Sequence, residues 1–178
     1  SEVDEFVKRS EDLLKKLEED VRRIVRESER LLEEVERRVR KILRDLEKKL
    51  EDAERERRED RDLDRMLREV EEEIRKIEKE LDDLLREDKR KLDDAVRKLE
   101  EVYRRNEEEL RKIEKKVKDK ELRDKLEEAH RKVKEKVERL MEDLKRAHDE
   151  SEKKIRDLKR KLREVLERLR KRVEEIKK

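Results

Sequence analysis

The sequence predicts an all-α protein, an antiparallel up-down-up three-helix bundle with long, nearly untwisted helices. Three observations lead to this prediction. The 178 residues include no Gly and no Pro, the residue types that most often interrupt helices. Apolar residues recur every 18 residues along the chain, a spacing that equals five turns at 3.6 residues per turn. The phase of this repeat breaks near residue 60 and again near residue 119, which divides the chain into three similar segments.

The first helix is expected over residues 2–57. Its repeat is clearest in three series of apolar residues: Val3, Val21, Val39; Val7, Val25, Leu43; and Leu14, Leu32, Leu50. A heptad repeat would impose a left-handed supercoil and an 11-residue repeat a right-handed one, so a repeat of 18 indicates nearly straight helices. A second row widens the apolar stripe to the width that a bundle core needs; it consists of Phe6, Leu13, Ile24, Leu31 and Ile42. Ser1 and Asp4 resemble a capping box at the start.

The second helix is expected over residues 61–117 and the third over residues 120–177. The same repeat runs through Leu63, Leu81, Leu99 and Val117, and then through Leu122, Leu140, Leu158 and Ile176. Extending the first series would place apolar residues at positions that hold Arg57, Arg61 and Asp64. We therefore expect turns near Arg58–Arg61 and Lys118–Lys120. The N-cap residues are expected to be Asp60 or Asp62 for the second helix and Asp119 for the third.

Residues 1–178 are expected to form one domain, because the connections between the helices are short and short connections make neighbouring helices antiparallel. The rival arrangement is one continuous helix in an oligomeric coiled coil. The two phase breaks count against that alternative, since they would misalign the apolar stripe. A monomer with no partner is therefore expected.

Charged residues make up 66% of the chain, yet the formal net charge is only +2 because 60 Lys and Arg nearly balance 58 Asp and Glu. The two signs are interspersed along the sequence rather than gathered in blocks. A nucleic-acid-binding protein would show a basic stripe or a strongly basic domain, so nucleic acid is not expected as a partner. No apolar run approaches the roughly 20 residues that span a bilayer, so no membrane partner is expected either. The chain has no Cys and hence no indication of its compartment. A soluble protein is expected, suited to recombinant cytoplasmic expression, with its localisation unknown.

The alphabet of the chain is restricted, since it lacks Gly, Pro, Cys, Trp, Gln and Thr. Together with the 18-residue repeat and the equal helix lengths, this resembles de novo designed, parametrically generated single-chain helical bundles. The resemblance covers the whole chain. It implies an idealised, very stable scaffold with no natural biochemical function, of a kind that sometimes contains buried hydrogen-bond networks.

Polar residues interrupt the apolar stripe in pairs that are 18 residues apart. The pairs are Ser10 with Ser28, Asp88 with Asn106, and His130 with His148, and Ser151 adds one more polar position. In an antiparallel bundle with turns near residues 60 and 119, these positions fall at two common heights. One layer is expected to hold Ser10, Asn106 and His130. The other is expected to hold Ser28, Asp88, His148 and Ser151.

The favoured interpretation is that these layers set helix register, because a buried polar group without a partner is costly and mismatched layers are penalised. A designed Ser-His-Asp hydrolase is the first alternative, since Ser28, His148 and Asp88 are the residue types of a catalytic triad. No cleft or oxyanion hole is evident, so no enzyme is expected. The second alternative is a helical interaction or switch module.

No metal site and no cofactor are expected. Each layer offers one His and at most one carboxylate, whereas a zinc site needs three or four converging ligands. His130 is expected to have neutral partners, so burial should lower its pKa.

Overall fold

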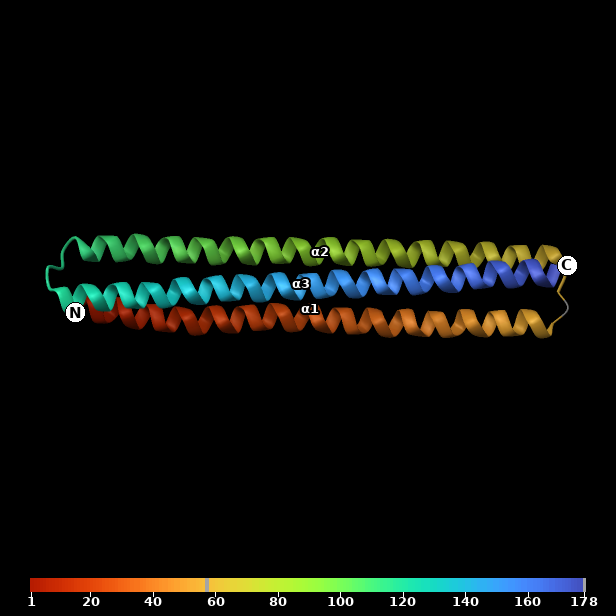
Figure 1. The fold of residues 1–178 in the computed structure, drawn as a ribbon, viewed down its shortest axis with the longest axis horizontal. Coiled ribbons are helices and arrows are strands. Elements are labelled where there is room, and N and C mark those ends of the chain that lie inside the picture. Colours follow the sequence, from red (N-terminus) through yellow and green to blue (C-terminus); the bar gives the residue numbers. More distant parts are fainter. Residues whose placement is uncertain (57, 178) are drawn as a thin grey trace. The chain divides into compact units, whose positions relative to one another are not determined.

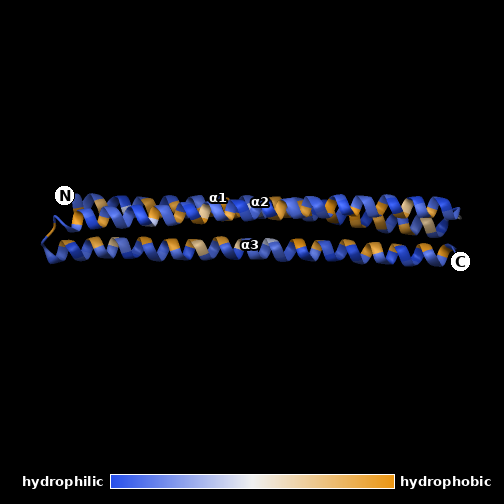
Figure 2. Cartoon of the chain, turned by 90° about the horizontal axis from the view of Figure 1, so that it is seen from above, coloured by the Kyte–Doolittle hydropathy of each residue, from blue (hydrophilic) through white to orange (hydrophobic). Residues whose placement is uncertain are grey.

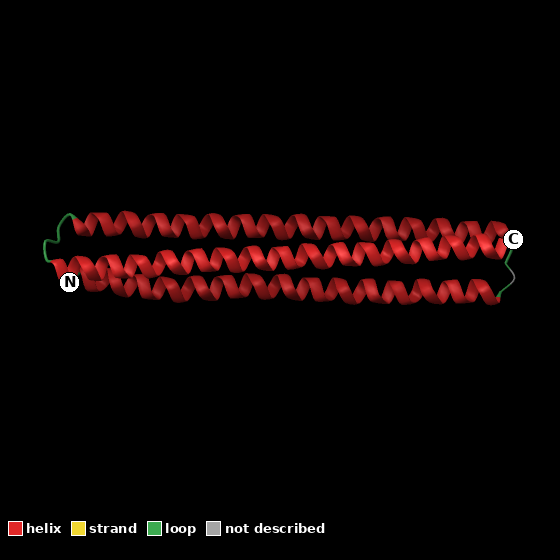
Figure 3. Cartoon of the chain, in the orientation of Figure 1, coloured by secondary structure: helices red, strands yellow, loops and turns green. Residues whose placement is uncertain are grey.

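The computed structural model describes residues 1–56 and 58–177, and all regular secondary structure within them is helical. The three helices are α1 (Glu2–Arg55), α2 (Asp60–Glu114) and α3 (Lys120–Lys177) (Figure 1). A short connection joins α2 to α3 and is drawn in green in Figure 3. The predicted fold class, an all-α three-helix bundle, is confirmed.

The helix bounds differ slightly from those expected from the sequence. The second helix begins at Asp60 and ends at Glu114, earlier than the expected end near residue 117. The third spans Lys120–Lys177, as the apolar repeat indicated. The expected end of the first helix at residue 57, and residue 178 at the end of the expected domain, lie outside the described residues.

The chain divides into two compact units, each built from segments of all three helices. Unit 1 consists of Ser1–Ser28 and Asp88–Asp149, and unit 2 of Glu29–Glu87 and Glu150–Lys178. The hydropathy pattern that builds their cores is visible in Figure 2, where orange residues recur at regular intervals along one side of α3.

The core of unit 1 contains two apolar clusters. The first surrounds Phe6, which is fully buried, and also includes Val3, Leu110, Ile113, Leu126 and Ala129. The second includes Leu17, Val21, Leu92, Ala95, Leu99, Val133, Val137, Leu140 and Leu144. Residue numbers fall along α2 as they rise along α1 and α3, so α2 is antiparallel to both of its neighbours. Each large apolar side chain buried in this way stabilises the unit by roughly 1.5–3 kcal/mol.

The core of unit 2 is one larger apolar cluster. Its most deeply buried members are Val39, Leu46, Ala53, Leu63, Val70, Ile74, Leu81, Leu162 and Leu169. Arg172 of α3 pairs with Glu54 of α1 at 2.7 Å, and Arg163 of α3 pairs with Glu78 of α2 at 2.8 Å. Leu31 is 39% exposed. The prediction that Leu31 widens the apolar stripe of the core was therefore wrong, because its position on α1 leaves much of its side chain in solvent.

Side-chain caps stabilise two of the three helix starts. Asp119 Oδ1 accepts hydrogen bonds from the backbone N–H groups of Glu121, at 2.8 Å, and Leu122, at 3.3 Å, so its predicted N-cap role is confirmed. At the chain start, Ser1 Oγ accepts from the backbone N–H of Asp4 at 3.3 Å. The Ser1 hydroxyl also donates to the Asp4 carboxylate at 3.1 Å.

The N-cap expected at Asp60 or Asp62 was wrong. Helix α2 already includes Asp60, and the carbonyl of Glu59 accepts from the backbone N–H of Leu63 at 3.2 Å, so Glu59 holds the cap position. Asp60 and Asp62 lie in the first turn instead. Their negative carboxylates interact favourably with the positive, N-terminal end of the helix dipole.

The connection between α2 and α3 forms without glycine because it avoids left-handed backbone. None of the residues that the structure describes has a positive φ. The last turn of α2 tightens, with Lys116 N–H donating to the carbonyl of Ile113 at 3.0 Å and Val117 N–H to that of Glu114 at 3.3 Å. These short-range bonds satisfy carbonyls that would otherwise lack partners at the helix end.

Candidate functional site: two buried polar layers

A chain of two hydrogen bonds links the three helices of unit 1 through Ser10, Asn106 and His130, which we call the asparagine layer. The side-chain amide of Asn106 donates from Nδ2 to Ser10 Oγ at 3.1 Å. The other amide atom, Asn106 Oδ1, lies 2.8 Å from His130 Nδ1. Ser10 is 2% exposed and Asn106 is 6% exposed. The layer therefore satisfies polar groups that water cannot reach, as buried polar groups require.

The orientation of Asn106 determines which nitrogen of His130 carries hydrogen. With Nδ2 donating to Ser10, the Oδ1 atom that faces His130 can only accept. Nδ1 of His130 must therefore be the donor, and the neutral ring carries its hydrogen there rather than on Nε2. Protonation of Nε2 leaves both hydrogen bonds of the layer in place.

His130 is partly buried, and its ring stacks on that of Tyr103 with centroids 5.2 Å apart and an interplanar angle of 29°. Burial lowers the pKa of His130 below its ordinary value of 6.5, and this desolvation outweighs the raising effect of Glu107 and Glu127. The predicted direction of the pKa shift is confirmed. The expectation of purely neutral surroundings was incomplete, because charged groups of α2 and α3 also act on the ring, namely Glu107, Arg111, Glu127 and Lys134.

Ser28, Asp88 and His148 form a second linked group in unit 1, which we call the aspartate layer. The Ser28 hydroxyl donates to Asp88 Oδ1 at 2.6 Å. His148 Nδ1 lies 2.8 Å from Asp88 Oδ2. The side chains of His148 and Asp88 are 10% and 18% exposed. One carboxylate of α2 thus joins the other two helices, using one oxygen for each.

Ser151 was expected in the same layer. It lies three residues after His148 on α3, is 6% exposed and belongs to unit 2. Its place in the layer stays a prediction.

The geometry of the aspartate layer differs from that of a catalytic triad. A triad needs the nucleophilic hydroxyl to donate to the histidine, which accepts its proton. Here the Ser28 hydroxyl donates to Asp88, and His148 binds the same carboxylate through its other oxygen. The aspartate therefore lies between the hydroxyl and the imidazole, in an order that differs from that of a catalytic triad.

Among the described residues, no group of three or more His, Cys, Asp or Glu side chains is arranged to hold a metal ion. In the same part of the chain, no helix has both the length and the apolar character needed to cross a membrane.

A third set of positions lies 18 residues from Ser28, Asp88 and His148 on the same helices, and its residues are apolar. It consists of Leu46, Val70 and Leu166, and each is less than a tenth exposed. All three belong to the core cluster of unit 2. The asparagine layer and the aspartate layer thus consist of polar residues on all three helices. The third set, at the equivalent positions one repeat further on, consists of apolar residues on all three helices.

Tyr103 is a further member of the site; its position on the face of Asn106 predicts a core side chain whose hydroxyl reaches a polar neighbour or the rim. Its aromatic ring, one helical turn before Asn106, stacks on His130. The spacing on α2 was the available signal, but the stacking partner lies on α3.

No protein-family model matches the chain, and the search of curated proteins found no match. The search of solved structures found a computationally designed three-helix bundle, which is 19% identical to this chain and has a TM-score of 0.37. The match covers 98% of this chain and 88% of that one. The assignment of this chain to the three-helix bundles rests on its own three helices and the contacts among them.

Proposed function

We propose that this chain is a de novo designed structural scaffold without a natural biochemical function, in which the two buried polar layers set the register of the helices. The restricted residue alphabet and the 18-residue repeat support a designed origin. The observation that carries the register role is the complementarity within each layer. Ser10, Asn106 and His130 satisfy one another, as do Ser28, Asp88 and His148.

Register needs such a device because the repeat makes successive core positions alike. Val3, Val21 and Val39 are one example of residues that would bury similar surface if they replaced one another. The short connections set the approximate height of each helix. Shifting a polar position on one helix alone would place a hydroxyl, amide or carboxylate against apolar groups. Each unsatisfied group then costs about 1–3 kcal/mol.

The proposal is tested by moving a layer rather than by deleting it. In the first variant, Ser28→Leu with Leu46→Ser shifts the polar position on α1 alone. We expect it to lose roughly 3–6 kcal/mol of unfolding free energy, because the Ser at position 46 is buried without a partner and leaves a packing defect. Denaturant unfolding followed by circular dichroism measures this loss.

The matched control adds Asp88→Val with Val70→Asp and His148→Leu with Leu166→His. This second variant has the amino-acid composition of the original chain and moves the whole aspartate layer by one repeat. If complementarity sets register, it recovers most of the stability lost by the first variant. A second variant no more stable than the first would refute the proposal.

Under the same proposal, the chain has no enzymatic activity, binds no partner and is a monomer. The hydrogen bond of Ser28 to Asp88 supports the first point, because the hydroxyl donates to a carboxylate and not to a histidine. The helical interaction or switch module is the alternative, and the oligomeric state distinguishes the two.

A further inference from the structure

Four ion pairs between α2 and α3 in unit 2 share one pattern. In each of them the cation lies on α3 and the carboxylate on α2; the pairs are Lys159–Asp82, Arg163–Glu78, Arg170–Glu71 and Lys177–Asp64. Because the two helices are antiparallel, the residue numbers of every pair add up to the same value. Opposite charges therefore meet along this edge of unit 2 at one fixed register.

The same relationship between residue numbers brings two carboxylates together in unit 1. The numbers of Glu114 on α2 and Glu127 on α3 add up to the value found for the four ion pairs. The two carboxyl groups are within hydrogen-bonding distance of each other. The next match along α3 is Lys134 with Glu107, where the cation acts on the carboxylate as the pattern requires. Glu127 thus places a carboxylate where the pattern has a cation on α3.

Nearby cations do not neutralise this contact. Arg111 acts on both carboxyl groups, but its guanidinium donates to Glu107 at 2.7 Å. Arg123 also acts on Glu114, and its influence is smaller than that of Glu127. The contact therefore keeps its excess negative charge when both carboxyl groups are ionised.

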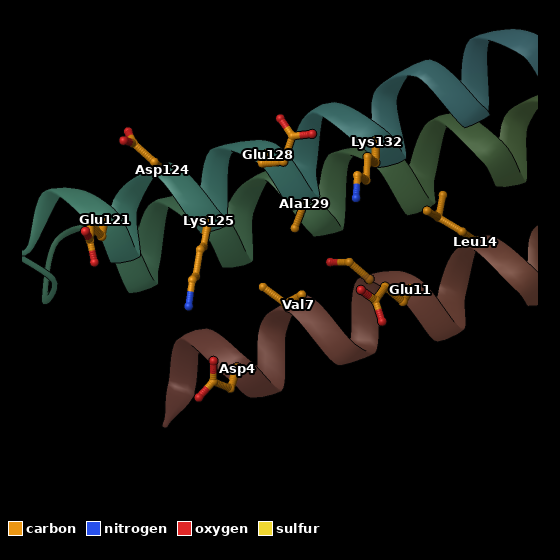
Figure 4. A pocket seen from close by; sticks show the side chains of 11 residues that line it. Asp4, Val7, Glu11, Leu14, Glu121, Asp124, Lys125, Glu128, Ala129 and Lys132 are labelled. Atoms are coloured by element: carbon orange, nitrogen blue, oxygen red, sulfur yellow. The ribbon is translucent and has the colours of Figure 1, made fainter.

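The cations on the α1 side of unit 1 are engaged elsewhere. Lys116 of the connection after α2 pairs with Glu2 of α1 at 3.8 Å. A groove of about 690 Å³ lies between α1 and α3, and Ser10 is among the residues that line it (Figure 4). Figure 4 shows Lys125 and Lys132 extending from α3 toward α1 in this groove. These ammonium groups therefore face α1 rather than the contact between α2 and α3.

The protonation state of Glu114 decides whether the contact attracts or repels. The hydrogen bond with Glu127 holds the pKa of the Glu114 carboxyl above its ordinary value of 4.5, and partial burial acts in the same direction. A protonated Glu114 donates to the Glu127 carboxylate, whereas two ionised carboxylates repel each other. A group whose pKa is raised by folding stabilises the folded state below its ordinary pKa. That contribution is lost as the pH rises through the folded-state value.

We propose that Glu114 and Glu127 form a proton-binding contact between α2 and α3, which joins the two helices through a shared proton in acid and repels them near neutral pH. The proton comes from solvent, because Glu127 is exposed. The contact stabilises unit 1 as the pH falls, whereas His130 has the opposite effect. This role is separate from the register role of the polar layers.

Carbon-13 NMR of the full chain tests the proton site directly. The side-chain carboxyl carbon of Glu114 should titrate with a midpoint above 4.5. Glu127→Gln should lower that midpoint, because its amide is uncharged and can donate to the ionised Glu114. Glu128→Gln is the matched control, since the Glu128 carboxylate accepts from Arg131 at 3.0 Å, and it should leave the midpoint unchanged. A Glu114 midpoint at or below 4.5, or equal shifts in the two variants, would overturn the proposal.

A double-mutant cycle separates the contact from the effect of each charge alone. At pH 7, Glu114→Gln and Glu127→Gln should each lower the unfolding equilibrium constant about two- to fivefold, the effect of exchanging a like-charge contact for a hydrogen bond. Combining the two substitutions should bring little further gain, because one Gln already removes the repulsion. Urea unfolding of the four proteins measures these constants.

The same cycle at pH 4 tests the role of the proton. The wild-type pair then shares a proton, so the advantage of the single variants should disappear. The influence of Glu127 on His130 cancels in the cycle, because it is the same with Glu or Gln at position 114. Additive gains at pH 7, or an advantage of the single variants that is undiminished at pH 4, would refute the shared proton.

Discussion

Ser28 donates its hydroxyl hydrogen to Asp88 Oδ1 at 2.6 Å, while the other oxygen of that carboxylate faces His148. The carboxylate is thus shared between a hydroxyl and an imidazole that belong to different helices. This relationship makes the aspartate layer a link among α1, α2 and α3. It also removes the hydroxyl–imidazole contact on which nucleophilic catalysis depends.

We expect Ser28→Ala to leave the hydrolysis of an activated ester such as 4-nitrophenyl acetate unchanged. The reason is that Asp88, rather than a histidine base, receives the Ser28 hydrogen. Initial rates of the wild type and the variant, each corrected for buffer hydrolysis, provide the measurement. A large loss of rate in the variant would instead support the hydrolase alternative.

We expect Asn106→Leu to lower the unfolding free energy by roughly 2–4 kcal/mol. It removes both hydrogen bonds of the asparagine layer and leaves Ser10 and His130 with unsatisfied groups. The triple variant Ser10→Leu, Asn106→Val, His130→Leu should recover much of this loss, since its residues are those at the apolar positions Leu46, Val70 and Leu166. Urea unfolding of both variants measures the difference. A triple variant less stable than Asn106→Leu would contradict the explanation.

The pKa of His130 makes stability depend on pH in a defined direction. Burial lowers the pKa of His130 in the folded state, so the unfolded chain binds more protons once the pH falls below the ordinary value of 6.5. The stabilising contribution is complete above pH 6.5 and is lost as the pH falls toward the folded-state pKa. His130→Leu should remove this loss. Unfolding free energies of both proteins at pH 7 and pH 5 test it, and equal losses would contradict it.

We expect Asp119→Ala to cost about 1 kcal/mol, the usual effect of deleting an N-cap side chain. Asp119 accepts two backbone hydrogen bonds at the start of α3. Asp60→Ala is the comparison, because Asp60 lies within the first turn of α2 and Glu59 holds the cap position. Thermal unfolding should show the smaller effect for Asp60→Ala. Equal losses of stability in the two variants would mean that both losses come from helix dipole interactions rather than from capping.

We expect sedimentation equilibrium to give the mass of one chain, 22.3 kDa, at all concentrations. The three helices already cover the apolar stripes of one another within each unit. A mass that rises with concentration would favour the interaction module instead.

The helices and the polar positions could be inferred from the sequence because both depend on local periodicity. An 18-residue repeat on a 3.6-residue helix places Ser10 and Ser28, or His130 and His148, on the same face wherever the helix lies. The N-cap at Asp119 follows from equally local chemistry. The pKa direction of His130 followed because a histidine on an apolar face is desolvated whatever its partners are.

Other features depend on the distances between helices, which no periodicity contains. Only the tertiary structure shows that Asp88 accepts from Ser28, that Asn106 orients His130 and that Tyr103 stacks on that ring. The exposure of Leu31, the cap at Glu59 and the groove lined by Ser10 are of the same kind. A repeat gives the face of a helix on which each side chain lies. Hydrogen bonds and cavities are decided within a few ångströms, by the separation and rotation of neighbouring helices.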